Sequence, residues 1–383
     1  MNKKVEQKKS IIISGYYGFD NCGDEAILMA MIQKLSKFIP PKRIIVLSQT
    51  PQKTEIEYKV NAIYRLNIYS IIAQLKNTGV FISGGGGLLQ DVSGRGLSII
   101  YYLSLIVLAL LFKVPVVVYG QGIGPVKKPI NRKLIKIVLA KVKLIIVRDE
   151  QSGILLQELG IKKDSVQVYS DPSFLLLKEE LPDHISEKYK LNQEVKAFTS
   201  NPIAALVLRN CGEIKQDYKQ KITQLIKIMD YLTEKQQTNI FLVPFQFNND
   251  LSLYDDLRRM ISNSEVNYLY EGLNPAQMLS LFSNFSLIIG MRFHAVIFAT
   301  ICNIPFIAID YDPKVRNYVN GLGLPELLLS INQLSVKNVA DKLRYIKDSQ
   351  ENIKTLLKSA AKEYQHSAGA GVDKLISFVK DHY

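Results

Sequence analysis

The motif Gly290-Met291-Arg292-Phe293-His294-Ala295 contains the residues best suited to chemistry, and an apolar segment of helical character, residues 296–302, follows it. A turn that leads into a helix places the Arg292 guanidinium and the His294 imidazole beside free backbone N–H groups, which suits an anionic substrate. The positive surroundings disfavour protonation of His294, so we expect a neutral imidazole that accepts a proton near neutral pH. The other histidines, at positions 184, 366 and 382, lie in a predicted linker or near the C-terminus, which favours His294 as the functional one.

Further cations stand where predicted strands end; they are Arg148 after residues 144–147, Arg209 after residues 205–208, and Lys314 shortly after residues 306–309. Since parallel strands end at one edge of a sheet, these side chains should point toward the crevice at that edge. A guanidinium there can bind a carboxylate or a phosphate through two hydrogen bonds. Any single arginine could instead form a local ion pair, for example Arg148 with Asp149.

Three glycine-bearing turns also follow predicted strands, at residues 14–25, 83–91 and 120–125. The four glycines at 84–87 suit a concave backbone surface that receives an anionic or polyhydroxylated ligand, with tight packing between domains as the alternative. In the first turn, Asp24 could cap the following helix or hold sugar hydroxyls. The spacing matches neither the dinucleotide fingerprint nor the Walker A motif, so the sequence does not support a dinucleotide or ATP site.

Short apolar segments alternate with helix-length amphipathic segments, which is typical of parallel βαβ units. We predict strands at residues 11–14, 43–47, 80–83, 114–119, 144–147 and 166–169, and again at 205–208, 240–244, 266–268, 287–289 and 306–309. The predicted fold class is therefore α/β, with two facing Rossmann-like domains of GT-B type and parallel sheets. The expected organisation is an N-terminal domain at 1–176, a linker at 177–202, a C-terminal domain at 203–350, and a helical segment at the domain junction at 351–383.

Bulk composition fits two ordinary globular domains, because 47% of the 383 residues are hydrophobic and 22% are charged. Cys22, Cys211 and Cys302 lie far apart without CxxC spacing, so we expect no disulfide framework, no obligatory metal and a cytoplasmic setting. The polar N-terminus lacks the design of a secretory signal. The apolar segment 97–112 is shorter than the roughly 20 residues of a membrane-spanning helix, and we expect a buried core helix rather than an interfacial one.

The net charge of +13 is unevenly distributed, since residues 92–148 contain no Asp or Glu. Within this segment, residues 130–143 combine helical apolar spacing with a basic face. Such a face suits anionic lipid or a pyrophosphate-linked substrate, although a plain solvated helix would look the same. Nucleic acid is disfavoured because no recognised binding motif accompanies the charge.

Taken together, these motifs resemble the polysaccharide pyruvyl transferase family, and most closely its CsaB-like branch. The resemblance extends over nearly the whole chain and rests on Ser14 to Gly18 with Gly23-Asp24-Glu25, the 84–91 loop, Gln121 to Pro125, Val147-Arg148-Asp149, Ser170-Asp171-Pro172, Gly290 to Ala295 and Asp310 to Lys314. It implies a GT-B fold with the acceptor on the side of residues 1–176 and the donor on the side of residues 203–350.

The same resemblance implies phosphoenolpyruvate as co-substrate, no obligatory cofactor, and an acceptor of the N-acetylmannosamine type on a polyprenyl-pyrophosphate-linked envelope precursor. It implies catalytic roles for His294, Arg292 and Arg148, and donor binding by these three with Lys314 and Gly290. The acceptor candidates are Asp24, Gly85, Gly86, Gln90, Asp91 and Arg209. With such an acceptor, the basic segment 127–143 would hold the protein at the anionic inner face of the plasma membrane.

Two other functions share these features. A nucleotide-sugar glycosyltransferase on the same fold would use the 84–87 glycines to cradle a nucleotide diphosphate. A non-catalytic module for anionic glycan or membrane would need only the positive charge. The grouping of several cations with one histidine favours a small, doubly acidic donor over both.

Overall fold

The structure is a computed structural model of the chain, and it describes residues 9–91, 97–189, 201–210, 214, 217–261 and 266–383. Contacts divide the chain into two compact units. The first comprises Met1–Phe19, Asp24–Leu176 and Tyr364–Tyr383, and the second comprises Asp20–Gly23 and Leu177–Glu363. Cys211, residues 190–200 of the predicted linker and residues 92–96 of the acid-free segment lie outside the described residues.

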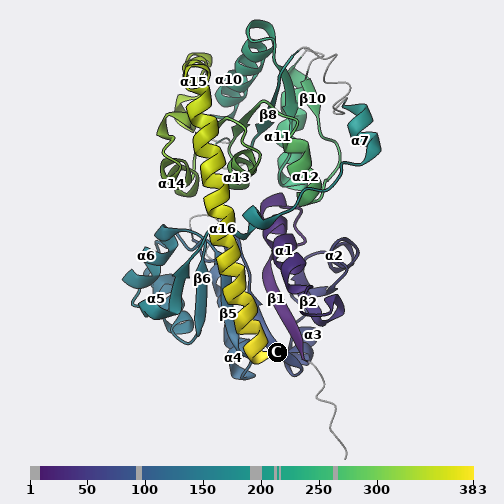
Figure 1. Cartoon of the computed structure of the whole chain (residues 1–383), viewed down its shortest axis with the longest axis vertical. Coiled ribbons are helices and arrows are strands. Elements are labelled where there is room, and N and C mark those ends of the chain that lie inside the picture. Colours follow the sequence, from purple (N-terminus) through teal and green to yellow (C-terminus); the bar gives the residue numbers. More distant parts are fainter. Residues whose placement is uncertain (1–8, 92–96, 190–200, 211–213, 215–216, 262–265) are drawn as a thin grey trace, which may run out of the picture. The chain divides into compact units, whose positions relative to one another are not determined.

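The described part of the first unit is built on a seven-stranded parallel sheet in the order β3-β2-β1-β4-β5-β6-β7, drawn in purple to teal in Figure 1. Its strands are β1 (Ser10–Tyr17), β2 (Ile44–Ser48), β3 (Asn61–Tyr64), β4 (Thr78–Ser83), β5 (Val116–Gln121), β6 (Leu144–Val147) and β7 (Val166–Val168). Its helices are α1 (Cys22–Leu35), α2 (Pro51–Tyr58), α3 (Ile68–Leu75), α4 (Leu97–Leu111), α5 (Pro129–Leu139) and α6 (Glu150–Glu158).

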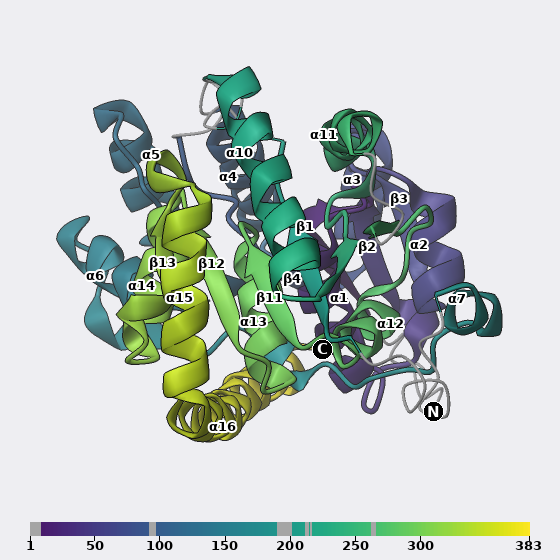
Figure 2. The ribbon, with the colours of Figure 1, turned by 90° about the horizontal axis from the view of Figure 1, so that it is seen from above.

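The strand order reverses direction at β1, and this places helices on both faces of the first sheet. The connections from β1 through β2 to β3 move toward one edge of the sheet, and those from β3 to β4 and onward move toward the other edge. Because each connection is right-handed, the helices of the two sets cover opposite faces. Side chains of α3, α4, α5 and α6 share one apolar cluster with Ile12, Phe81 and Val118 of the sheet. Figure 2 shows α4 and α5 together beyond this face.

The described part of the second unit has a six-stranded parallel sheet in the order β10-β9-β8-β11-β12-β13. Its strands are β8 (Ile203–Val207), β9 (Asn239–Leu242), β10 (Val266–Tyr268), β11 (Leu287–Gly290), β12 (Phe306–Asp310) and β13 (Leu328–Ser330). Its helices are α7 (Asp183–Lys188), α10 (Tyr218–Asp230), α11 (Phe247–Met260), α12 (Pro275–Phe282), α13 (Phe293–Ile301), α14 (Pro313–Gly321) and α15 (Val336–Asp348). The prediction of two parallel sheets in an α/β fold is thus confirmed.

Two strands were absent from the prediction, β3 and β13. Both lie at an edge of their sheet and are short, with four and three residues. Edge strands are buried less completely, and β3 accordingly combines Asn61 and the exposed Tyr64 with two apolar residues. Such a segment lacks the continuous apolar run that identified the central strands.

The segment predicted as a linker, residues 177–202, carries structure of its own where it is described. It contains α7 and groups with the second unit. The Asn274 amide donates to the Glu179 carboxylate at 2.9 Å, and the Tyr189 hydroxyl donates to the Tyr268 carbonyl at 2.6 Å. The C-terminal helix α16 (Gln350–His382) is continuous; its residues group with the second unit as far as Glu363 and with the first from Tyr364.

Helix α4 is buried on one face only, whereas the sequence analysis predicted a buried core helix. Ile99, Tyr102 and Ile106 lie in the core of the first unit, whereas Ile100 and Leu111 are exposed. The burial expectation was wrong for the outward face because the helix covers a sheet on one side only. Within the described residues, no helix combines the length and apolarity required to cross a membrane.

Candidate functional site

Arg209 and Arg292 follow neighbouring strands at equivalent positions, at the carboxyl edge of the second sheet. Strands β8 and β11 are neighbours, with Val207 in register with Gly290. Arg209 and Arg292 each stand two residues beyond that pair, so both side chains leave the sheet at the same edge. This confirms the expectation that arginines after these strands share an edge.

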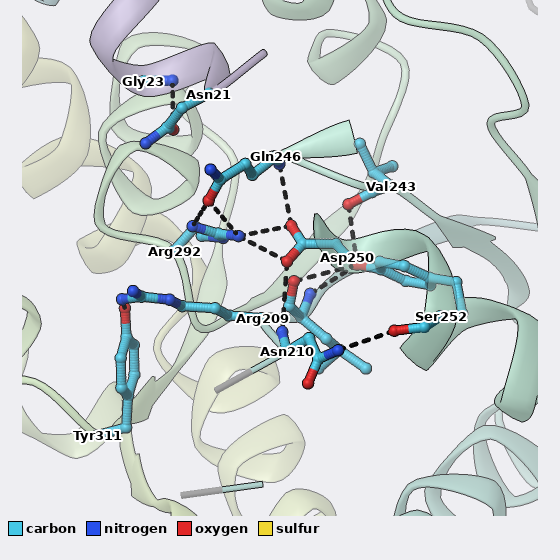
Figure 3. A network of polar contacts seen from close by, with 12 residues as sticks. Asn21, Gly23, Arg209, Asn210, Val243, Gln246, Asp250, Ser252, Arg292 and Tyr311 are labelled. Carbon is cyan, nitrogen blue, oxygen red and sulfur yellow. Dashed lines mark hydrogen bonds and ion pairs between the residues drawn. The ribbon is translucent and has the colours of Figure 1, made fainter. Parts of the chain in front are cut away.

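Arg292 is oriented by a buried carboxylate. It is the N-cap residue of α13, and its Nη2 donates to Oδ1 and Oδ2 of Asp250 at 2.6 and 2.7 Å (Figure 3). Asp250 lies in the first turn of α11, is fully buried, and also accepts hydrogen bonds from the backbone N–H groups of Gln246 and Asn210. The Gln246 side-chain oxygen lies 3.4 Å from both Nη atoms. Arg292 is therefore a fixed donor, and part of its charge is offset by Asp250.

His294 lies in the first turn of α13 and is buried. Its Nδ1 occupies the space that a side chain at position 23 would fill, because a Cβ built on Gly23 would overlap with it. The absence of a side chain at Gly23 thus sets where the imidazole can lie. Sequence reasoning named Gly23 as part of a motif but gave it no connection to His294.

The segment Asp20–Gly23 is attached to the second unit by several hydrogen bonds. The Cys22 N–H donates to the Phe245 carbonyl at 2.9 Å, and the Phe247 N–H donates to the Asp20 carbonyl at 3.3 Å. The Asn248 amide donates to the Asp20 carboxylate at 3.0 Å. These bonds hold Gly23 in place, and Figure 3 shows Asn21 and Gly23 near Gln246 and Arg292.

Arg209 is held by Tyr311, which follows β12. Its Nη1 donates to the Tyr311 hydroxyl at 3.0 Å, and its Cζ lies 5.6 Å from the centre of the tyrosine ring. Burial raises the pKa of Tyr311, although the adjacent Arg209 acts in the opposite direction, so the phenol stays protonated. The sequence analysis named Arg209 both as a cation at the end of strand 205–208 and as an acceptor candidate; in the structure it lies at the same sheet edge as Arg292.

The other two donor candidates also lie in the second unit. Lys314 is half-buried in the first turn of α14, where its N–H donates to the carboxylate of the N-cap residue Asp312. Gly290 ends β11, and a Cβ there would make only ordinary van der Waals contacts. Packing alone therefore gives no reason for a glycine at position 290.

Arg148 lies in the first unit, so its expected convergence with Arg292, His294 and Lys314 stays a prediction. Its Nη1 donates to Asp171 at 2.7 Å, and both side chains are buried. The local pair with Asp149 does not form, because Asp149 caps α6 and accepts from the Ser152 backbone and hydroxyl. A Cβ on Gly122 would lie 2.8 Å from Nε of Arg148, so this glycine makes room for the guanidinium.

The glycine run after β4 packs tightly against side chains of its own unit. A Cβ on Gly84 would overlap with the Tyr17 hydroxyl, one on Gly85 with Ile27, and one on Gly86 with the Asp24 carboxylate. Gly86 also has a φ of +97°, which only glycine adopts easily. Packing inside the first unit therefore explains three of the four glycines, whereas the alternative considered from the sequence was packing between domains. Acceptor contacts by Asp24, Gly85 and Gly86 stay a prediction.

Gln90 and Asp91 close the same loop. Gln90 is half-buried. Asp91 is a structural residue, since its carboxylate accepts from the N–H groups of Lys127 and Lys128 and from the Asn131 amide. Burial disfavours its charged form, but these hydrogen bonds outweigh burial and lower the pKa of Asp91. We therefore no longer assign Asp91 to the acceptor, because its oxygens already hold the start of α5.

Glu25, next to Asp24, was named in the sequence only as part of a motif, and the structure shows that it is a buried acid. The carboxyl group of Glu25 accepts from the Gly18 N–H and the Tyr58 hydroxyl, each at 2.7 Å. Burial raises the pKa of Glu25 to about 8, despite these two hydrogen bonds, which favour the charged form. Glu25 is thus protonated at neutral pH and adds no negative charge to this edge of the first sheet.

Among the residues that the structure describes, no group of three or more His, Cys, Asp or Glu side chains is arranged to hold a metal ion. The arginines and the histidine at the edge of the second sheet can instead bind an anion and move a proton. The described geometry therefore suits chemistry on a small acidic molecule.

Comparison with known proteins identifies a family. The family model described as polysaccharide pyruvyl transferase matches residues 21–313. The amylovoran biosynthesis protein AmsJ of Erwinia amylovora is 22% identical over 268 residues. That match covers 67% of this chain and 63% of AmsJ, so the chain spans less than two thirds of the length of this relative.

Solved structures similar to the chain include enzymes that handle UDP-sugars. The S. aureus MnaA–UDP structure superposes with a TM-score of 0.66 at 14% identity and covers 97% of this chain and 96% of its own. Anabaena Alr3699/HepE with UDP and glucose gives 0.63 at 12% identity, covering 97% and 100%. Neisseria meningitidis UDP-GlcNAc 2-epimerase bound to UDP-GlcNAc gives 0.63 at 14%, covering 97% and 99%. These likenesses concern the fold alone, and they confirm the predicted GT-B type.

Proposed function

Since the chain belongs to the polysaccharide pyruvyl transferase family, we propose that it transfers the enolpyruvyl unit of phosphoenolpyruvate to a sugar of a cell-envelope polysaccharide precursor and forms a pyruvate ketal. The proposed acceptor is a sugar of the N-acetylmannosamine type on a polyprenyl-pyrophosphate carrier. Phosphoenolpyruvate is a cytoplasmic metabolite, so the proposed reaction takes place in the cytoplasm.

The observation that carries this proposal is the grouping of Arg209 and Arg292 at one edge of the second sheet, with His294 in the first turn of the helix that begins there. Phosphoenolpyruvate carries its carboxylate and its phosphate on the same carbon, C2, and guanidinium groups bind both kinds of anion. Asp250 holds Nη2 of Arg292, while Nε has no hydrogen-bond partner within the described residues. Nε and Nη1 would therefore serve the substrate, with Arg209 and Lys314 supplying charge that Asp250 does not offset.

The chemistry must add a proton at C3 and two sugar oxygens at C2. Protonation of C3 turns the methylene into a methyl group, and one sugar hydroxyl attacks C2 and loses its proton. The second hydroxyl attacks the same carbon as the bond from C2 to the phosphate oxygen breaks, and its proton leaves with phosphate or solvent. The arginines stabilise the departing phosphate by electrostatic preorganisation.

His294 is the proposed group for moving these protons. It would protonate C3, accept the proton of an attacking hydroxyl, or do both in turn. Its position in the first turn of α13 places it next to the backbone donors of that helix and to Arg292.

The test is to incubate the protein with phosphoenolpyruvate and candidate sugars, and to measure phosphate release and ketal formation by mass spectrometry. We expect His294→Ala to lower turnover by about 100- to 10,000-fold while the protein stays folded. His366→Ala in α16 is the matched control and should retain full activity. Wild-type ketal formation by His294→Ala would refute the assignment.

The same incubation separates the competing functions. Release of UDP from a UDP-sugar, without phosphate release from phosphoenolpyruvate, would indicate a glycosyltransferase. The absence of turnover with either donor, over a panel of acceptors, would favour a binding module.

A further inference from the structure

The outward surface of α3, α4 and α5 is an unusual part of the first unit. These helices cover the same face of the sheet, because their inner side chains, including Ile71, Ile106 and Ile135, belong to one core cluster. In this layer α4 packs against α5, and the Tyr101 hydroxyl of α4 donates to the carbonyl of Arg65, in the turn before α3, at 2.6 Å.

Large apolar side chains are exposed along this layer. In the described part of the chain, eight of the fifteen exposed large hydrophobic residues lie on it or in the turn before α3; they are Leu66, Ile68, Tyr69, Ile100, Val107, Leu111, Ile130 and Ile137. On α4, positions 100, 107 and 111 are spaced by seven and four residues, so they share one face of the helix. Leu111 is 74% exposed. Single apolar residues scattered over a surface are normal, but a concentration of them on neighbouring helices is typical of an interaction site.

Negative charge is almost absent from the same layer. Between Tyr58 and Arg148 the sequence contains one acidic residue, Asp91, and its buried carboxylate is bonded to the start of α5. The nearby acid on α6, Glu158, is paired with Arg132 at 3.6 Å. Exposed lysines border the apolar band; they are Lys76, Lys113, Lys127, Lys128, Lys133, Lys136, Lys141 and Lys143.

We propose that the outward face of α3, α4 and α5 docks on an anionic lipid bilayer. The apolar side chains would enter the interfacial region, and the lysines would contact phosphate headgroups. Only α5 and its basic residues were foreseen from the sequence; the apolar band on α3 and α4 is a finding of the structure. This proposal does not depend on the proposed reaction.

The charge of this face favours an anionic bilayer over a second copy of the chain and over nucleic acid. A second copy of the same face would bring lysines against lysines, which disfavours a symmetric dimer. Nucleic acid would satisfy the lysines but would leave the apolar band without a partner, since phosphate contacts dominate such complexes. An anionic bilayer complements both the charge and the apolar surface.

The experiment is flotation of the full-length protein with vesicles of phosphatidylcholine alone or with about 30 mol% phosphatidylglycerol. We expect binding only to the anionic vesicles, and weaker binding when the salt concentration rises from about 0.1 M to 0.5 M. Failure of the wild-type protein to float with anionic vesicles at low salt would overturn the proposal.

Variants connect the binding to this face. Lys133→Gln with Lys136→Gln should weaken partitioning at least tenfold, from about fivefold for each basic residue. Leu111→Ser with Ile137→Ser should weaken it by a similar factor or more, since each loses about tenfold. The matched control is Ile56→Ser on α2 with Lys37→Gln; Ile56 is 79% exposed and belongs to a helix outside the α3–α6 core cluster. Equal loss in the control would show that this face is not responsible.

Two further measurements complete the test. Phosphate release from phosphoenolpyruvate with a water-soluble acceptor should be unchanged in the docking variants, so a failed docking proposal and a failed reaction give different results. Light scattering should show no change of mass between wild type and Leu111→Ser with Ile137→Ser. Loss of a dimer in that variant would assign the face to a second copy of the chain and overturn the lipid proposal.

Discussion

In the first unit Arg148 follows β6 and pairs with Asp171 at 2.7 Å, with 4% and 3% of the two side chains exposed. In the second unit Arg292 leaves β11 and meets both oxygens of Asp250, with 8% and 0% exposed. Each sheet therefore ends in a buried arginine held by a buried aspartate. The two edges differ in what surrounds that pair.

Around the first pair the sheet edge carries carboxyl and hydroxyl groups. Asp24 lies against Gly86, Glu25 is a buried acid, and the Tyr17 hydroxyl is buried. Around the second pair lie His294 and Arg209. The same kind of sheet edge thus carries buried carboxyl and hydroxyl groups in one unit and a second arginine with a histidine in the other, and the division into acceptor and donor sides stays a prediction.

Removing either aspartate should have the largest effect on stability. We expect Asp250→Ala to lower the free energy of unfolding by about 3–5 kcal/mol, because it leaves a buried guanidinium without its carboxylate. Asp171→Ala should fall in the same range, since it leaves the buried Arg148 guanidinium without its carboxylate. Urea denaturation measures both. A loss below about 1 kcal/mol in either variant would show that the pair is not a structural anchor.

The pH dependence of stability tests the buried acid of the first edge. The folded protein retains the Glu25 proton up to about pH 8, whereas a glutamate in the unfolded chain releases it near pH 4.5. The free energy of unfolding should therefore fall as the pH rises between these two values. Glu25→Gln stays neutral throughout, so its free energy of unfolding should fall by about 3 kcal/mol less than that of the wild type over this interval. Denaturation at pH 5 and pH 9 measures the difference. Parallel curves would mean that Glu25 is already ionised at neutral pH.

Adding a methyl group at two glycines compares how closely each edge is packed. Gly23→Ala should displace the His294 ring and lower kcat by about 100-fold, because small misplacements of catalytic groups are costly. Gly122→Ala should cause a smaller loss of about tenfold, since its methyl group meets Nε of Arg148 at 2.8 Å and the guanidinium can shift. Gly272→Ala, with nothing within 4 Å of the new Cβ, is the control. Equal activity of all three variants would contradict the role assigned to Gly23.

The smallest expected effect concerns Arg209. Tyr311→Phe removes the hydroxyl that accepts from Nη1 and keeps the ring, so we expect the KM for phosphoenolpyruvate to rise about three- to tenfold with kcat nearly unchanged. Tyr69→Phe on α3 is the control. An unchanged KM would place Arg209 outside the donor site.

Much of the fold could be predicted because its signals are local. The central strand β6 matched its predicted bounds, since it is a short apolar segment between helical patterns, and the edge strand β10 matched its bounds as well. The edge strands β3 and β13 were not recognised; β3 mixes polar and apolar residues within four positions, and β13 has only three residues. For the site, the motif around Arg292 and His294 was recognised, and its position at the start of α13 followed from the strand and helix patterns.

The sequence by itself determined the alternation of strands and helices, the family, and the placement of Arg209, Arg292 and Lys314 after strands of one sheet. These follow from periodicity and from the rule that parallel strands end at one edge. Only the tertiary structure decided that Asp250 holds Arg292, that Gly23 makes room for His294, and that α4 exposes an apolar band. Such facts depend on which distant segments the crossovers bring together and which helix face a sheet covers, and no local pattern contains that information.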